Sequence, residues 1–281
     1  MELETMKFEL REDGIGILTL NRPEKLNAIS FQLEEDFHQV LDHLMVNLDC
    51  RVLILRGEGR AFSAGTDLQE GLTLNTKKTP EGYERFYFLN VKEPIKRKMY
   101  HQWHITQIIV KMRKISQPII ALIQGAAAGG GLAFALASDI RIVTKDAKFI
   151  NASINIGLTG ADMGGSYFLP RLIGRARASE ILMSGRIVDG VEAEHIGLAV
   201  KLVDEPDLLN AGLELAEELL TKSPLGLRMT KEAINLSLDS PSLENIVQFE
   251  NSSIMITFSS KDVNEASSAF FEKRKPKYPL K

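Results

Sequence analysis

Two glycine-rich segments carry the residue types best suited to chemistry in this chain. Residues 60–68 read Arg-Ala-Phe-Ser-Ala-Gly-Thr-Asp-Leu, and residues 124–132 read Gln-Gly-Ala-Ala-Ala-Gly-Gly-Gly-Leu. Each follows an apolar run typical of a buried strand, and open α/β sheets bind ligands at the carboxyl ends of their strands. The three glycines Gly129–Gly131 open a predicted helix, although each costs up to ~1 kcal/mol relative to alanine inside a helix. They favour a site where a ligand approaches the backbone closely.

Such a helix start suits an anion. Its N–H groups lack intrahelical partners and lie at the positive end of the helix dipole. The segment Ala64-Gly65-Thr66 offers a second N–H donor from the neighbouring strand. A pair of donors is the usual requirement for an oxyanion hole that stabilises a thioester enolate. Close packing of a helix on a strand is the alternative explanation for each glycine-rich segment.

Several other chemistries are disfavoured. Gly125 to Gly131 lacks the dinucleotide spacing G-x-G-x-x-G, and no Lys-Ser/Thr follows as in a phosphate loop. Ser166 lacks the G-x-S-x-G elbow of serine hydrolases. The single cysteine, Cys50, permits no disulfide within one chain. We predict no metal site, because the histidines form no ligand spacing; they are His38, His43, His101, His104 and His195.

Composition narrows the function classes further. The chain has 281 residues, 44% of them hydrophobic, which is enough for one large domain or a domain with an appendage. The net charge of −3 and the scattered basic residues predict no nucleic-acid partner. No apolar run approaches the ~20 residues that span a bilayer, and the acidic N-terminus resembles no targeting peptide. We therefore expect no membrane partner and a cytoplasmic location.

The elements that position the glycine-rich segments alternate between strand and helix. A strand, a helix and another strand in succession predict a parallel sheet with crossovers, hence an α/β fold. Ser30 is a candidate cap for the first helix. The predicted elements are strands at 7–10, 15–20, 52–55, 118–123 and 140–143, and helices at 31–45 and after Gly129.

Two segments fall outside this alternation. Residues 71–113 are polar and aromatic-rich, and we interpret them as an insertion with one or two helices that lines the site. Strand signals stop after Val203, so residues 1–203 form the predicted core and residues 204–281 a helical appendage. Its helices are predicted at 208–220, 225–238, 243–258 and 263–271.

Four motifs, in this order along nearly the whole chain, resemble the enoyl-CoA hydratase/isomerase, or crotonase, superfamily. The resemblance implies a spiral of ββα units, a C-terminal helical region that builds trimers, and a homotrimer or homohexamer. It also implies an acyl-CoA thioester substrate and no cofactor, since coenzyme A is part of the substrate. The motifs are Asn21-Arg-Pro-Glu-Lys-Leu-Asn-Ala28, Ala61-Phe-Ser-Ala-Gly-Thr-Asp67, the segment from Gly125 to Asp139, and Ala269-Phe-Phe-Glu-Lys-Arg274.

The resemblance also assigns site residues. The oxyanion donors are expected to be the backbone N–H groups of Thr66 and Gly130. Phe270 and Lys273 are expected to reach the CoA of a neighbouring subunit, although Lys273 also fits a solvated basic tail. The basic residues of Lys92–Lys98 fit either CoA phosphates or a solvated helix face. CoA is expected to run past Lys25, Leu26, Ala28, Ala64, Asp67 and Leu68.

The chain departs from the family pattern at two catalytic positions. Hydratases of the family resemble one another in two glutamates, where this chain has Ala133 and Ser153. An alanine cannot transfer a proton. Asp162 resembles the acid of family isomerases, with one extra residue between Gly157 and Asp162. It would alternatively cap the helix leading to Arg171.

Three functions remain open from the sequence. Double-bond isomerisation with Asp162 as acid/base is the leading hypothesis, because it needs one acid. Hydration is the alternative, with Asp162 assisted by another group such as Glu70. Asp139 more plausibly orders a strand start. The third hypothesis is a non-catalytic acyl-CoA-binding protein, and other reactions of the family use the same oxyanion hole.

Overall fold

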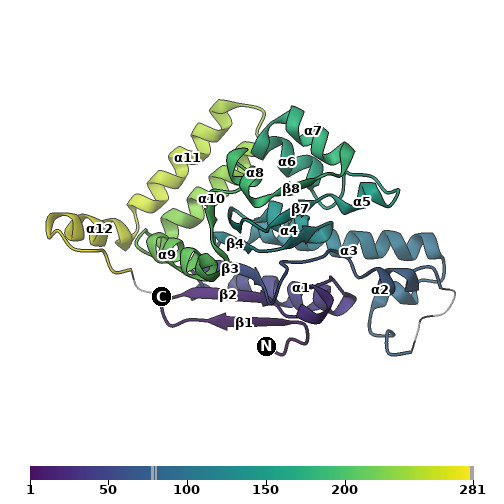
Figure 1. Cartoon of the computed structure of the whole chain (residues 1–281). Helices are drawn as coiled ribbons and strands as arrows, with labels where there is room; N and C mark the ends of the chain where they lie inside the picture. The colour runs from purple at the N-terminus through teal and green to yellow at the C-terminus, as the bar shows by residue number, and fades with distance from the viewer. Residues whose placement is uncertain (77–78, 80, 279–281) are drawn as a thin grey trace.

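The computed structural model describes residues 1–76, 79 and 81–278, and its centre is a six-stranded sheet (Figure 1). The strand order is β1-β2-β3-β4-β6-β9. β1 pairs with β2 as an antiparallel hairpin, and every other pairing in this sheet is parallel. The predicted hairpin and parallel crossovers are therefore confirmed. The strands are β1 (Met6–Leu10), β2 (Ile15–Leu20), β3 (Val52–Gly57), β4 (Ile119–Ile123), β6 (Ile140–Thr144) and β9 (Lys201–Val203).

A second, three-stranded sheet was not predicted. Its strands are β5 (Ala126–Ala128), β7 (Lys148–Ile150) and β8 (Ile187–Asp189). β7 pairs in parallel with β5 and antiparallel with β8. Three-residue strands are too short to show the alternation by which strands are recognised. β5 also lies inside the glycine-rich segment that the sequence marked as a loop.

The helices follow the expected periodicity. Ser30 caps α1, because its Oγ accepts a hydrogen bond of 3.1 Å from the Leu33 N–H. The helices in the first half are α1 (Phe31–Val46), α2 (Leu68–Thr73), α3 (Pro94–Lys114), α4 (Gly130–Ala137) and α5 (Ala152–Asn155). Those in the second half are α6 (Gly165–Ile173), α7 (Arg175–Ser184), α8 (Gly190–His195), α9 (Leu208–Leu220), α10 (Pro224–Asp239), α11 (Leu243–Phe258) and α12 (Lys261–Phe271).

Apolar side chains of the parallel strands alternate between two buried clusters. Leu53 and Leu55 of β3 face a cluster that includes side chains of α1, α3 and α4. Val52 and Ile54 of the same strand face a second cluster, which includes side chains of α9. Successive strand residues point to opposite faces, so a sheet covered on both sides needs a continuous apolar run.

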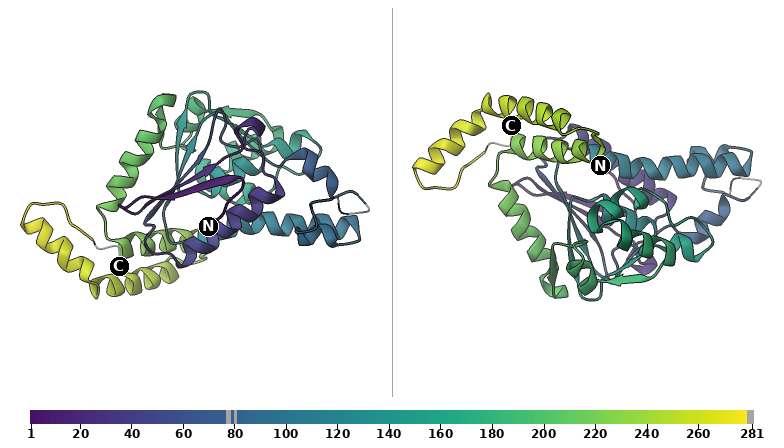
Figure 2. Two further views of the ribbon diagram at one scale, coloured as in Figure 1. Left: turned by 90° about the horizontal axis from the view of Figure 1, so that it is seen from below. Right: turned by 90° about the horizontal axis from the view of Figure 1, so that it is seen from above.

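Two helices that the sequence assigned to the appendage and to the insertion also cover the sheet. α9 packs directly on the sheet, where a Cβ on Gly212 would lie 2.8 Å from Leu122 Cδ1. The second half of α3 contributes Ile105, Ile108 and Met112 to the large cluster. The buried clusters on the sheet therefore include side chains of α9 and of the end of the predicted insertion. α12 instead projects from the body, at the end opposite α2 (Figures 1 and 2).

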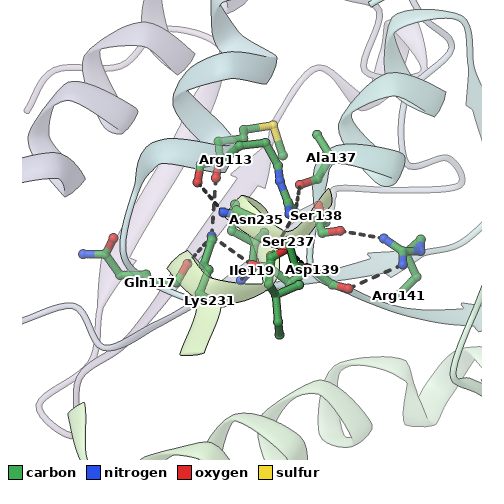
Figure 3. Close-up of polar contacts among 12 residues, drawn as sticks. Arg113, Gln117, Ile119, Ala137, Ser138, Asp139, Arg141, Lys231, Asn235 and Ser237 are labelled. Carbon is green, nitrogen blue, oxygen red and sulfur yellow. Dashed lines mark hydrogen bonds and ion pairs between the residues drawn. The ribbon is translucent and has the colours of Figure 1, made fainter. Parts of the chain in front are cut away.

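A buried ion cluster fastens α10 to the sheet (Figure 3). Lys231 Nζ lies 2.9 Å from Asp139 Oδ2 and donates to the Gln117 carbonyl at 2.7 Å. Burial lowers the pKa of Lys231, and the charge of Asp139 opposes that shift. Asp139 also accepts from the Ile119 N–H at 2.8 Å and pairs with Arg113 at 3.0 Å. The expectation that Asp139 orders a strand start is confirmed for β4.

We expect Lys231→Met to lower the free energy of unfolding by about 3 kcal/mol, because it removes the buried cation paired with Asp139 and leaves the buried Gln117 carbonyl without its donor. Urea denaturation measures the change. Lys222→Met is the matched control, because Lys222 is exposed, and it should change stability by less than ~0.5 kcal/mol. Equal stability of the Lys231 variant and the control would contradict the role given to the cluster.

His38 joins α1 to α3 in a single protonation state. Its Nε2 lies 3.0 Å from the His104 carbonyl, so Nε2 must donate and Nδ1 carries no proton. Nδ1 is buried and has no hydrogen-bond partner in the described part of the chain. Burial, assisted by the charge of His104, lowers the pKa of His38 from 6.5 to about 4.

The folded state therefore binds fewer protons than the unfolded state between pH 6.5 and 4, and acid should destabilise it. This contribution is fully present above pH 6.5 and is lost as pH falls, by on the order of 2 kcal/mol. We expect His38→Gln, which keeps a donor for the carbonyl, to remove that loss. Urea denaturation of both proteins at pH 7 and 4.5 tests this, and parallel pH dependences would contradict it.

Candidate active site

The two glycine-rich segments run side by side, as the sequence predicted. The Phe62 N–H donates to the Gln124 carbonyl, and the Ser63 N–H donates to the Ala126 carbonyl, both at 2.8 Å. The Ala128 N–H donates back to the Ser63 carbonyl at 2.9 Å. This parallel pairing fixes the first segment against β5.

Gly65 allows the two segments to touch. Its φ is +87°, and an added Cβ would lie 2.6 Å from the Ala128 carbonyl oxygen and 3.4 Å from the Gly130 nitrogen. Thr66 follows Gly65 directly, so its N–H lies close to that of Gly130. Neither N–H donates to another group in the described part of the chain. The structure thus brings together the two donors that the sequence assigned to the oxyanion hole.

Glycine is needed for a different reason at each of the three positions at the start of α4. Gly129 has φ +50° and ψ −115°, a conformation that favours glycine. A Cβ on Gly130 would lie 2.5 Å from Ile29 Cδ1, and one on Gly131 would lie 2.5 Å from the Ser63 oxygen. Close packing and a free donor therefore coexist here, and neither interpretation excludes the other.

Asp162 lies on a loop that packs against the donor segment. The neighbouring Met163 is buried, and its Sδ would be 3.4 Å from a Cβ on Gly130. Asp162 Oδ1 accepts from Gln102 Nε2 at 2.7 Å, and Oδ2 accepts from Ser153 Oγ at 3.5 Å. The loop that carries Asp162 therefore packs against the start of α4 through Met163.

The capping role weighed for Asp162 is not observed. The N-cap of α6 is Gly164, and no side chain caps this helix in the described part of the chain. Asp162 contributes only its backbone carbonyl there, which accepts from the Gly165 N–H at 2.8 Å. Its carboxylate instead faces Gln102 and Ser153.

The other candidate acid, Glu70, uses both carboxylate oxygens in hydrogen bonds to the protein. Glu70 Oε2 accepts from the Phe31 N–H at 2.7 Å, at the start of α1, and Oε1 accepts from the Tyr83 hydroxyl at 3.3 Å. Burial, followed by the nearby Glu70 charge, raises the pKa of Tyr83. A carboxylate at a helix N-terminus is stabilised by the helix dipole. Ala133 is buried in the first turn of α4.

The segment with the first predicted CoA residues packs against the donor segment. The Ala64 N–H donates to the Leu26 carbonyl at 2.9 Å, while Lys25 is exposed and Ala28 is half-buried. Asn27 holds this segment in place and was missed as a site residue. It is fully buried, and its Nδ2 donates to the Ala61 carbonyl at 2.8 Å.

The remaining predicted CoA residues have different settings. Asp67 caps α2, accepting from the Gln69 N–H at 3.1 Å, and lies 3.3 Å from Arg22. Leu68 is 66% exposed beside it. Phe270, 79% exposed, lies on α12, and Lys273 follows that helix, so one chain does not bring them to the donor loops (Figure 2).

The interpretation of Lys92–Lys98 as a solvated helix face is wrong for one residue. Within the basic patch, Arg97 is buried rather than solvated, and its Nη1 donates to the Thr76 carbonyl at 2.7 Å. His101 Nε2 lies 2.8 Å from Glu34 Oε1. Among the described residues, no group of three or more His, Cys, Asp or Glu side chains is arranged to hold a metal. None of the helices they form is both long and apolar enough to span a bilayer.

Known proteins resemble this chain along nearly its whole length. The family model for enoyl-CoA hydratase/isomerase matches residues 10–280. A probable enoyl-CoA hydratase of Mycobacterium leprae is 35% identical over 269 residues, which cover 92% of this chain and 85% of the relative. The 1,2-epoxyphenylacetyl-CoA isomerase of Escherichia coli is 33% identical over 270 residues, 95% of each chain.

Solved structures give the same answer for the fold. A probable enoyl-CoA hydratase/isomerase from Mycobacterium abscessus superposes with a TM-score of 0.86 at 33% identity, covering 99% of this chain and 100% of that one. The core is thus the crotonase fold that the motifs predicted. Matched along nearly its whole length, the chain belongs to the enoyl-CoA hydratase/isomerase family and is an acyl-CoA enzyme.

Proposed function

We propose that this enzyme moves the double bond of an enoyl-CoA thioester, with Asp162 as the acid/base. The Asp162 carboxylate takes a proton from C2 of a 3-enoyl thioester, and the electron pair delocalises onto the thioester oxygen. The N–H groups of Thr66 and Gly130 stabilise that negative charge. The protonated Asp162 then returns the proton to C4, which leaves a 2-enoyl thioester. The reaction needs no cofactor beyond the CoA of the substrate.

The observation that carries this proposal is that the loop with Asp162 packs against the start of α4, through the contact of Met163 with Gly130. Isomerisation uses one group twice, as base and then as acid, whereas the hydration pattern of the family uses two carboxylates. Ala133 offers no proton, and both oxygens of Glu70 are engaged at the start of α1 and by Tyr83. An isomerase is also among the similar proteins.

Hydration remains the second candidate, because the Mycobacterium leprae relative is named as a probable hydratase. In that case Asp162 would activate water without a second carboxylate.

For either reaction, the proposed walls of the acyl pocket are the insertion helices α2 and α3. Each presents exposed apolar side chains, which are Leu68 and Leu72 on α2 and Met99 and Trp103 on α3.

We also propose that the working form is a homotrimer or homohexamer. α11 and α12 carry exposed apolar side chains, among them Ile254, Phe258 and Phe271. Burying such a surface against another copy is favourable. A neighbouring copy could then bring Phe270 and Lys273 to the CoA that is bound past Lys25 and Leu26.

The first test compares wild type with Asp162→Asn. Both proteins are incubated with 2-enoyl-, 3-enoyl- and dienoyl-CoA thioesters in deuterium oxide, and products are identified by mass spectrometry. We expect the variant to lose at least ~100-fold in turnover, the contribution typical of an acid/base group, with CoA binding kept. A product that only shifts its double bond identifies an isomerase, and one that gains water identifies a hydratase.

The control for that test is Asp204→Asn, because Asp204 is an exposed surface acid that pairs with Lys145. It should turn over substrate like wild type. Equal activity of Asp162→Asn and wild type would refute the proposed role of Asp162.

The second test addresses the donor pair through Gly65→Ala. The new methyl group would meet the Ala128 carbonyl and push the two N–H groups apart. Removing one oxyanion donor typically costs about 100- to 1,000-fold in kcat, so we expect a loss of this size. Gly71→Ala is the matched control, because a Cβ there meets nothing within 4 Å. Similar kcat values for both glycine variants would argue against the donor pair.

A further inference from the structure

The geometry points to Gln102 as a positioning residue that holds the Asp162 carboxylate for proton transfer. This inference rests on the proposed role of Asp162. The Gln102 Nε2 to Asp162 Oδ1 distance is 2.7 Å, the shorter of the two side-chain contacts that the carboxylate makes in the described part of the chain. Sixty residues separate the two side chains along the sequence.

Gln102 reaches the loop from a rigid support. The preceding residue, His101, is buried and bonded to Glu34 of α1, and Ile105 one turn later belongs to the main core cluster. Asp162, in contrast, lies on the segment between α5 and α6. A second hydrogen bond holds that segment near Asp162, because Asn151 Nδ2 donates to the Gly160 carbonyl at 3.0 Å. The Gln102 contact thus connects the acid to a fixed helix.

Packing does not explain this contact. Gln102 is exposed, so its side chain has other rotamers in water, and holding it in one rotamer costs side-chain entropy. A hydrogen bond to a carboxylate is stronger than one between neutral groups, and it offsets that cost. The charge on Asp162 therefore orders Gln102, and Gln102 in turn fixes the carboxylate.

The two carboxylate oxygens consequently differ. Oδ1 accepts from the amide N–H of Gln102, whereas the contact of Oδ2 among the described residues is the 3.5 Å one with Ser153 Oγ. Oδ2 is then the oxygen that takes the proton from C2 and returns it to C4. Oδ1 still has a lone pair when Oδ2 is protonated, so the Gln102 bond persists through both steps and keeps the acid in one orientation.

The test uses an isosteric replacement. In Gln102→Glu a carboxylate replaces the amide, so the position loses its N–H donor and repels the Asp162 carboxylate. Because Gln102 is exposed, we expect the folding stability of the variant to stay near that of wild type. We expect kcat to fall about 30-fold or more in this variant and about 10-fold in Gln102→Met, with KM changing less than about 2-fold. The ratio of deuterium taken up at C2 of the recovered 3-enoyl substrate to 2-enoyl product formed should rise, because a misaligned Asp162 delivers its proton to C4 less often.

Matched controls come from the same helix. Gln107→Glu and Gln107→Met make the same changes at a half-buried glutamine of α3, and both should leave kcat and deuterium uptake as in wild type. A role of Gln102 in folding alone would lower the amount of active enzyme but would not change the ratio of exchange to product.

The two possible failures are distinguishable. If Gln102→Glu keeps wild-type kcat and exchange ratio while Asp162→Asn is inactive, Gln102 does not position the acid and the proposed function stands. If Asp162→Asn is as active as wild type, the proposed function fails and this inference fails with it.

Discussion

The parallel pairing of Phe62 and Ser63 with β5 brings two stretches of backbone to a distance that side chains would prevent. A Cβ at Gly65 or at Gly131 would collide with a carbonyl oxygen of the opposite segment. Glycine at these positions allows the contact, and the N–H groups of Thr66 and Gly130 beside it donate to no group within the part of the chain that the structure describes. A thioester oxygen that gains negative charge is stabilised by such donors because they are already oriented before the reaction.

The rest of the fold keeps this contact in place. The first donor loop follows β3, and the second precedes α4, whose start is packed against Ile29 and Met163. Both strands that lead to the loops are buried on both faces, so a one-residue slip would force the side chains of two closely packed clusters to change places. The ion cluster around Asp139 fixes the start of β4 and the end of α4 together, and therefore supports the second loop from behind.

Local patterns made most of this architecture predictable. The near-continuous apolar run Ile15–Leu20, the helical spacing from Phe31 and the capping residue Ser30 each depend on neighbours in sequence. The donor pair was also predictable, because three consecutive glycines at a helix start are costly without a reason. The family motifs added the roles of Thr66 and Gly130, and the CoA contacts and subunit arrangement remain predictions.

Features that depend on distant contacts were not predictable in the same way. Nothing near Gln102 marks it as a partner of Asp162, and the exposed-looking charge of Arg97 gives no sign that three backbone carbonyls surround it. Asn27 lies within a recognised motif, but its clamp on the Ala61 carbonyl appears only in three dimensions. Short strands such as β5 depend on their partners rather than on their own residues.

α3 begins beside the site and ends inside the core. Its first half presents Met99, Gln102 and Trp103 at the surface, and its second half is one wall of the main cluster. If the proposed function holds, substrate preference, the geometry of Asp162 and folding stability all depend on this one continuous helix. A change that tilts α3 to admit a larger acyl group would then also move Gln102, so redesign of the proposed acyl pocket is safest through α2, which contributes no fully buried side chain.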